Sequence, residues 1–230
     1  MQQYLPILTK CALFRDMSNE DILHISHCLN IKTRSFPADS YLFFMNDIVN
    51  SIGIIVEGEV EVVKETIAGG RHIIAILHPS DLFGEGIVCT KSRQAPVTVR
   101  TRTPSTICFL PFEFVIKTCH NSCSFHTELI RNMMSILGEK NLQLNYKIDL
   151  LTLKGMREKL ATYLLMFSAQ VGTEEFNLPF NRNELAEFLN VSRTSMSREL
   201  GHMKEEGLID YHLNRVKILD KEAMLSFIDE

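Results

Sequence analysis

The segment NRNELAEFLNVSRTSMSRELGHMKEEG (181–207) carries the most informative pattern of polar and charged side chains in the chain. Asn181 and Glu184 form a capping box that predicts the start of one helix, and Asn190–Val191 predict a tight turn after it. Ser192 can cap a second helix. The inner face of that second helix is apolar and consists of Met196, Leu200 and Met203. This pattern predicts a helix-turn-helix.

The opposite face of the second predicted helix is polar and basic, and carries Ser192, Arg193, Thr194, Ser197 and Arg198. Arginine offers a planar fork that fits the major-groove edge of guanine, and serine or threonine can reach bases or phosphates. The amino-terminal turns of such a helix are the part that enters the groove. A predicted hairpin follows, and its Arg215 and Lys217 could contact phosphates as a wing does. These residues predict binding to double-stranded DNA.

A second interpretation treats residues 154–230 as a purely structural helical domain of a signalling module, whose β-rich part binds a small molecule or a partner. Residues 154–230 contain ten lysines and arginines against thirteen acids, a net charge of −3, which agrees with that view. However, residues 188–198 contain Arg193 and Arg198 and no acid. A local basic strip is enough for DNA binding, so we favour a DNA-binding domain.

The elements before this segment change character along the chain. Residues 1 to about 30 predict a short helix capped by Ser18, which we expect to serve as a lid or brace rather than as core. Residues 31–116 alternate short β-rich runs with turn residues, and predict strands at 41–44, 53–56, 60–63, 73–77, 97–99 and 106–110. A strand about every ten residues is typical of a small antiparallel β-roll.

Residues 122–153 predict one long helix with apolar residues at heptad-like spacing, namely Ile130, Met133, Leu137, Leu144, Ile148 and Leu151. The series has one polar interruption at Lys140–Asn141. Such a helix either packs on its own chain or forms a two-stranded dimer seam, and we favour the seam. The expected fold is α+β, with a sensory domain (1–121), a dimerisation helix (122–153) and a winged helix-turn-helix (154–230).

The composition narrows the function further. The chain has 230 residues, of which 45% are hydrophobic and 23% charged, and its net charge is −4. These values describe a globular protein and exclude a wholesale polycation. We find no apolar run that predicts a membrane span and no signal peptide, so we expect a cytoplasmic protein. We find no glycine-rich phosphate loop, no Gly-x-Ser-x-Gly and no paired-histidine metal motif, and therefore expect no enzyme.

In its whole length the chain resembles the Crp/Fnr family of bacterial transcription regulators. The resemblance rests on IIVEGEVEVVKE (54–65), HPSDLFGEG (78–86) and SRTSMSREL (192–200). It implies a homodimer that reads a two-fold DNA site, with RNA polymerase as a further partner. Arg198 falls on the family's guanine-reading arginine, while Thr194 falls where many members carry a glutamate. Asp39 and Asn46 replace two family glycines, and both residue types tolerate left-handed backbone.

The resemblance also bears on the effector. Cyclic-nucleotide binders of this family use a Gly-Glu pair for the ribose and an Arg-Ser pair for the phosphate. Gly84–Glu85 is present, but Ala95 and Pro96 stand at the Arg-Ser positions, with Arg93 two residues away. A buried phosphate without its charge partner is costly. We therefore expect an effector other than cyclic AMP, and include Leu144 and Asn145 of the long helix among the candidate effector-binding residues.

Metal chemistry has one weak candidate. Cys119, Cys123 and His126 have i, i+4 and i+7 spacing, so they could share one helix face, and cysteine and histidine suit zinc or iron. None of the six cysteines forms a CxxC motif, and we favour reduced thiols and no metal site. The sequence leaves the effector and any cofactor unknown.

Overall fold

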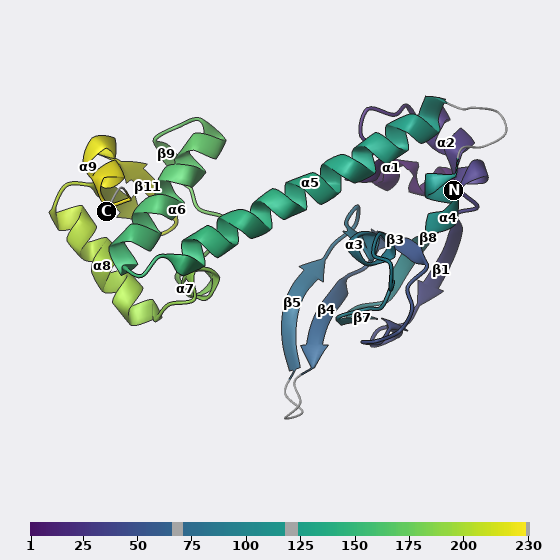
Figure 1. Cartoon of the computed structure of the whole chain (residues 1–230), viewed down its shortest axis with the longest axis horizontal. Helices are drawn as coiled ribbons and strands as arrows, with labels where there is room; N and C mark the ends of the chain where they lie inside the picture. Colours follow the sequence, from purple (N-terminus) through teal and green to yellow (C-terminus); the bar gives the residue numbers. More distant parts are fainter. Residues whose placement is uncertain (66–70, 118–123, 229–230) are drawn as a thin grey trace. The chain divides into compact units, whose positions relative to one another are not determined.

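The computed structural model describes residues 1–65, 71–117 and 124–228. The chain folds as two compact units, Met1–Lys140 and Asn141–Glu230. A single long helix, α5 (Ser124–Thr152), contributes residues to both units (Figure 1). Among the described residues, none of the helices combines the length and the apolar composition that a bilayer crossing requires.

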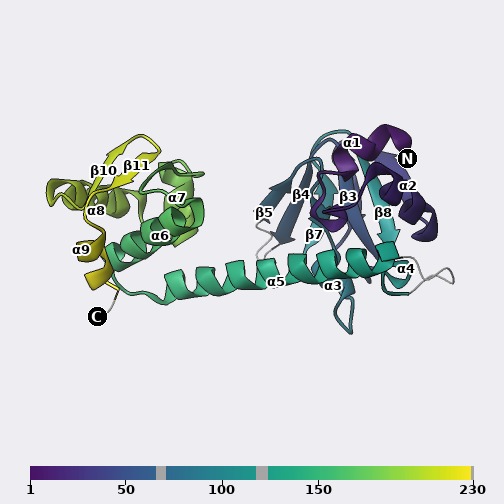
Figure 2. The same cartoon turned by 90° about the horizontal axis from the view of Figure 1, so that it is seen from above.

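Two antiparallel sheets form the β-roll of the first unit (Figures 1 and 2). One has the strand order β1 (Lys32–Phe36), β8 (Ser105–Pro111), β3 (Ser51–Glu57) and β6 (Leu82–Phe83). The other has the order β2 (Tyr41–Phe43), β7 (Thr98–Thr101), β4 (Val60–Glu65) and β5 (Arg71–Leu77). The facing apolar residues form a buried cluster of Ile55, Val60, Phe83, Val99 and Ile107. The predicted antiparallel β-roll is confirmed.

Several turns of the roll use left-handed backbone. Gly58 has φ +85°, and a Cβ there would lie 2.4 Å from the carbonyl oxygen of Pro104. Asp39 and Asn46 have φ of 61° and 74°. Aspartate and asparagine are the residues that best replace glycine in this conformation. The two substitutions therefore preserve the path of the chain.

The amino-terminal segment is core and not a lid, so that expectation is wrong. It contains η1 (Gln2–Tyr4), α1 (Leu5–Leu8), η2 (Ala12–Phe14) and α2 (Asn19–Cys28), and Ser18 caps α2 in a capping box with Asp21. Leu13, Ile22 and Leu29 are completely buried in one cluster with β3, β8 and α5. The outer face of β3 and β8 is apolar and needs a cover, and these helices supply it.

The first half of α5 packs on its own chain. Leu129, Met133 and Ile136 are buried in the core of the first unit. The amide of Asn132 donates to the carbonyl oxygens of Leu13 and Arg15, at 3.2 and 2.8 Å. Short helices α3 (Glu85–Val88) and α4 (Phe112–Ile116) complete this unit.

The apolar series of α5 therefore differs from the predicted one at one position. Met133 is 5% exposed in the core of the first unit, whereas Leu137 is half-buried against the same core. Met134 is 69% exposed and takes the position that we assigned to Met133. The outward series is Ile130, Met134, Leu137, Leu144, Ile148 and Leu151.

The second unit is a winged helix-turn-helix. It contains α6 (Met156–Val171), β9 (Glu175–Asn177), α7 (Arg182–Leu189), α8 (Arg193–Glu205), β10 (Ile209–His212), β11 (Arg215–Ile218) and α9 (Lys221–Ser226), with strand order β10-β11-β9 (Figure 2). Its core includes Leu160, Leu189 and Met196. The hairpin turn is formed by Leu213–Asn214, and Leu213 has φ +54°.

Candidate functional site

The helix-turn-helix is shaped by hydrogen bonds within residues 181–191. The side-chain oxygen of Asn181 accepts from the backbone amides of Asn183 and Glu184, at 2.9 and 3.1 Å. Asn190 has φ 52° and ends α7, and the Val191 amide then donates to the Ala186 carbonyl at 2.9 Å. These contacts confirm the predicted cap and turn and fix the start of α8.

Burial on one side of α8 determines what the other side presents. At most 1% of the surface of Met196, Leu200 and Met203 is exposed. The exposed face carries all of the predicted groove residues of this helix: Ser192, Arg193, Thr194, Ser197 and Arg198. The hydroxyls of Ser192 and Thr194 lie 2.8 Å apart, so the Ser192 side chain does not cap a backbone amide. Within the described residues, no ion pair involves the guanidinium of Arg193 or Arg198.

Arg157 of α6 binds two acids of α8, and the sequence analysis missed this residue. Its guanidinium donates to Glu199 at 2.6 Å and to both carboxylate oxygens of Glu206 at 2.8 and 2.7 Å. These hydrogen bonds raise the pKa of Arg157 and lower the pKa of Glu206. Arg157 thereby holds both carboxylates on the α6 side of α8 and offsets one of their two negative charges, away from the face that carries Arg193 and Arg198.

The wing is less basic than its two cations suggest. Arg215 forms an ion pair with Glu175 of β9. Lys217 is exposed and lies opposite Asp210 on one neighbouring strand and Glu175 on the other. Both predicted wing residues are therefore at the surface, but each has an acidic neighbour that weakens its attraction for phosphate.

Arg182 is a second residue that the sequence analysis missed. Its guanidinium lies 4.6 Å from the centre of the Tyr211 ring and donates to the Leu213 carbonyl at 3.3 Å. Burial lowers its pKa. Arg182 thus ties the start of α7 to the hairpin and positions the wing.

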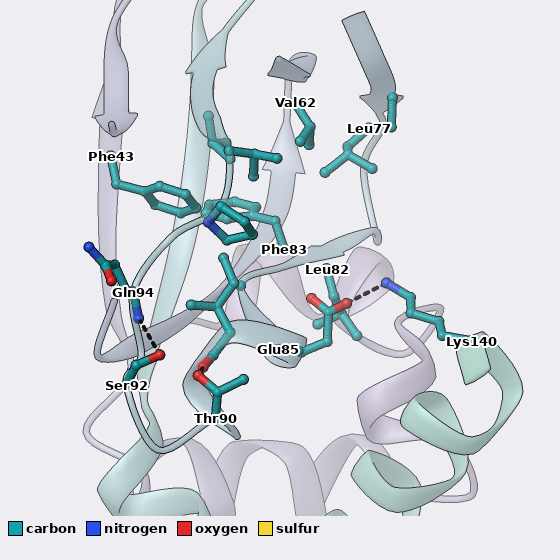
Figure 3. Close-up of a pocket in the computed structure, with 17 residues that line it drawn as sticks. Phe43, Val62, Leu77, Leu82, Phe83, Glu85, Thr90, Ser92, Gln94 and Lys140 are labelled. Carbon is teal, nitrogen blue, oxygen red and sulfur yellow. Dashed lines mark hydrogen bonds and ion pairs between the residues drawn. The ribbon is translucent and has the colours of Figure 1, made fainter. Parts of the chain in front are cut away.

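The first unit contains a cavity of about 470 Å³ between the β-roll and α3 (Figure 3). Its walls are mostly apolar and include Phe43, Val62, Leu77, Leu82, Phe83, Pro96, Val97 and Val99. Thr90, Ser92 and Gln94 supply the uncharged polar groups. The cavity can therefore hold a small molecule with a largely apolar body.

Two charged side chains line this cavity, and they bind one another. Glu85 of α3 is 5% exposed, and Lys140 of α5 forms an ion pair with its carboxylate (Figure 3). A buried carboxylate needs such a partner. Glu85 is among the residues expected from the sequence, whereas Lys140 is not, although it is part of the polar interruption in the heptad series. The ion pair links the cavity wall directly to the long helix.

Two family models match the chain. The cyclic nucleotide-binding domain matches residues 33–122, and the Crp-like helix-turn-helix domain matches residues 158–227. The chain belongs to the Crp/Fnr family. It is accordingly a DNA-binding transcription regulator of the Crp/Fnr type, and its relatives are regulators rather than enzymes.

Individual relatives in the family are distant but cover most of the chain. The transcriptional activator protein FnrA of Stutzerimonas stutzeri is 26% identical over 184 residues, which are 78% of this chain and 73% of that protein. The cyclic AMP receptor protein of Thermus thermophilus is 22% identical over 214 residues, 93% of this chain and 94% of that protein. A solved mutant of CooA from Carboxydothermus hydrogenoformans has a TM-score of 0.57 at 18% identity, covers 93% and 92% of the two chains, and shows the shared fold.

The residues expected at the family's ribose- and phosphate-binding positions lie at or near the cavity wall. Gly84 and Pro96 line the cavity, but Ala95 is buried in the core behind it. Arg93 is half-buried, with its guanidinium 5.7 Å from the centre of the Phe112 ring and 3.2 Å from the side-chain oxygen of Asn50. Arg93 therefore does not line the cavity. The structure places no arginine among the described residues of the cavity wall.

The remaining candidate effector and metal residues lie elsewhere. Leu144 and Asn145 are exposed, belong to the second compact unit and do not line the cavity. His126 is 2% exposed and its Nδ1 has no hydrogen-bond partner within the described chain. Cys119 and Cys123 lie outside the described residues. In the part of the chain that is described, no three histidine, cysteine or acidic residues are grouped to hold a metal.

Proposed function

We propose that this chain acts as a homodimer that reads a two-fold-symmetric operator with α8, under the control of a signal other than cyclic AMP. The observation that carries this proposal is the distribution of charge around α8. Arg193 and Arg198 face solvent without an ionic partner in the described structure, whereas Glu199 and Glu206 are bound by Arg157. A helix of this design presents arginine forks to guanine without a competing carboxylate.

The proposed dimer uses the outward series of α5. Ile130, Met134, Leu137, Leu144, Ile148 and Leu151 leave apolar surface exposed at spacings that fit a coiled-coil seam. Exposed apolar side chains in a row are costly in water unless a partner covers them. Two copies related by a two-fold axis would present two α8 helices to successive turns of the major groove.

The proposed signal enters the cavity of the first unit. The wall offers apolar surface, three uncharged polar side chains and the Glu85–Lys140 pair, and a cyclic phosphate would find no guanidinium there. Pro96 also removes a backbone donor at a position where the family supplies one. A ligand that donates to Glu85 would compete with Lys140 for this carboxylate and so act on α5. Control of DNA binding then requires different ligand affinity in the two dimer states.

The proposed partners are double-stranded DNA, a second copy of the chain and RNA polymerase. The DNA and the polymerase imply that the protein acts in the cytoplasm. The alternative is a signalling module whose second unit is only structural. The wing supports that alternative in one respect, because Arg215 and Lys217 both have acidic neighbours.

A salt series separates the two functions. Binding to a random-sequence duplex, followed by fluorescence anisotropy, should weaken linearly in log–log form as salt rises, since each phosphate contact releases counterions. Selection from a randomised library should then yield an operator with two-fold symmetry. A structural module would give no binding even at the lowest salt, and this result would refute the proposal.

A further inference from the structure

The second unit has a pocket of its own, separate from the cavity of the β-roll. The pocket has a volume of about 640 Å³ and lies between the last turns of α5, helix α6 and the end of α7. Its walls are rich in aromatic rings, with Tyr146, Tyr163, Phe167 and Phe188. The amides of Gln143 and Gln170 supply polar groups. Nothing in the proposed function uses this pocket.

Lys147 is the one charged side chain among the described residues that line the pocket. Its ammonium lies 3.4 Å from the centre of the Phe188 ring and donates to the Phe188 carbonyl. No carboxylate forms an ion pair with it in the described structure. Burial lowers its pKa, which reflects the cost of a charge held in an apolar site. An ammonium has three donors, so Lys147 can bind an anion in addition to its carbonyl.

Tyr163 adds a second donor to the same pocket. It is 6% exposed, and burial raises its pKa to about 12, so its phenol keeps its proton at neutral pH. A protonated hydroxyl can donate to a carboxylate oxygen, whereas a phenolate could not. The pocket therefore combines flat aromatic walls with a cation and a neutral donor. A planar ring with one negative group matches these features.

We propose that the pocket formed by α5, α6 and α7 binds a small aromatic carboxylate, with its ring among the aromatic side chains and its carboxylate on Lys147. The ligand contacts Phe188 near the end of α7, so it also braces the helix-turn-helix against the long helix. The seam residues Leu144, Ile148 and Leu151 face solvent on α5, whereas Lys147 and Leu150 face the pocket. The same helix can therefore serve both surfaces.

The test uses 2-naphthoate and its neutral analogue 2-naphthamide with the full chain. The chain contains no tryptophan, so naphthalene fluorescence can be excited at wavelengths longer than those that its tyrosines absorb. We expect 2-naphthoate to bind one per chain and at least about tenfold more tightly than 2-naphthamide, the size of one charged hydrogen bond. Lys147→Met should abolish this preference, and Lys147→Arg should retain most of it.

Two lysine variants serve as controls. Lys159→Met removes a cation of α6 that donates to the Leu151 carbonyl and does not line the pocket, and 2-naphthoate affinity should not change. Lys140→Met removes the cation of the β-roll cavity. Loss of binding in Lys140→Met but not in Lys147→Met would assign the probe to that other cavity and overturn the proposal. Equal affinity of the wild-type chain for both probes would overturn it without recourse to any variant.

Discussion

Helix α8, which we propose contacts DNA bases, and the β-roll cavity differ in how their charged side chains are paired. Arg157 binds Glu199 of α8 and Glu206 directly after the helix, and the arginines of the other face are left for an external partner. In the cavity the acid Glu85 is buried, and its cation Lys140 is already occupied. The first surface is prepared for a polyanion. The second offers a phosphate no uncommitted cation among the described residues that line it.

The two units must satisfy different binding partners, and this limits which of their residues can vary. DNA has the same phosphate backbone and the same groove edges whatever the regulator senses, so the reading surface must keep its arginines. Under the proposed function, the effector can change as long as the cavity still acts on the same helix. In this chain the Glu85–Lys140 ion pair joins the cavity wall to α5. Substitutions at the dimer seam, on α8, at Arg157 and in the cavity can test this difference.

Substitutions in the proposed dimer seam should have the largest effect. They should remove specific DNA binding and leave the β-roll cavity unchanged. Leu144→Glu combined with Ile148→Glu should give monomers, since each lost apolar contact costs about 1.5–3 kcal/mol and the new charges repel across the axis. Specific DNA binding should be lost with the dimer. Sedimentation equilibrium measures the first effect and anisotropy the second.

Leu142→Glu is the matched control for the seam. Leu142 is 58% exposed, close to the 63% of Leu144, but it lies outside the outward series. The control should remain a dimer. If Leu142→Glu dissociates the dimer and the double variant does not, the interface lies on another face of α5.

Arg198→Ala tests the reading face alone. The side chain is exposed, so its loss creates no cavity, but a bidentate base contact is worth about 1–3 kcal/mol in each half-site. A dimer loses it twice, and affinity for the selected operator should fall accordingly, while non-specific binding falls less. Lys221→Ala removes an exposed cation of α9 and should change neither. Operator affinity equal to that of the wild type would show that Arg198 reads no base.

Local patterns in the sequence predicted most of the reading unit. The capping box of Asn181 with Glu184 and the buried stripe of Met196 depend on residues within one or two helical turns. Arg157 escaped because its acids lie 42 and 49 residues away, and Lys140 because its partner lies 55 residues away. No periodicity encodes such pairs. Met133 was misassigned because α5 has two apolar faces, one for its own core and one for solvent.

The amino-terminal helix illustrates the same limit on a larger scale. Its cap was predictable from Ser18, but its burial depends on the outer face of β3. The strand Ser51–Glu57 is buried on both faces, with Ile54 toward the helices and Ile55 toward the other sheet. A run of consecutive apolar residues indicates such a strand but does not say which segment covers it.

A smaller effect should follow from Arg157→Met, which restores the negative charge of α8. Glu206 has a lowered pKa in the folded chain, so its ion pair stabilises the fold above the ordinary glutamate pKa of 4.5 and stops doing so as pH falls through the lowered value. The stability difference between wild type and variant should therefore shrink as pH drops below about 4.5. Urea unfolding measures it, and Lys221→Met should show no such trend.

The same variant should weaken DNA binding a few-fold, because Glu199 and Glu206 would then repel phosphates from α8. High salt should reduce this loss by screening the exposed acids. A DNA affinity that is unchanged at low salt would mean that Arg157 only supports the fold.

The smallest expected effect concerns the cavity and cyclic AMP. Ala95 and Pro96 supply neither guanidinium nor hydroxyl, and Arg93 is directed to Asn50 and Phe112 outside the cavity. A cyclic phosphate would lose a charge partner and two hydrogen bonds, and Glu85 is already bound by Lys140. Calorimetric titration of the chain with cyclic AMP should therefore show no binding at micromolar concentrations, and operator affinity should be the same with and without it. Arg93→Ala should behave as the wild type in both measurements. Micromolar binding that disappears in Arg93→Ala would show that this arginine turns into the cavity when ligand enters, and the contrast between a prepared reading helix and a committed cavity would no longer hold.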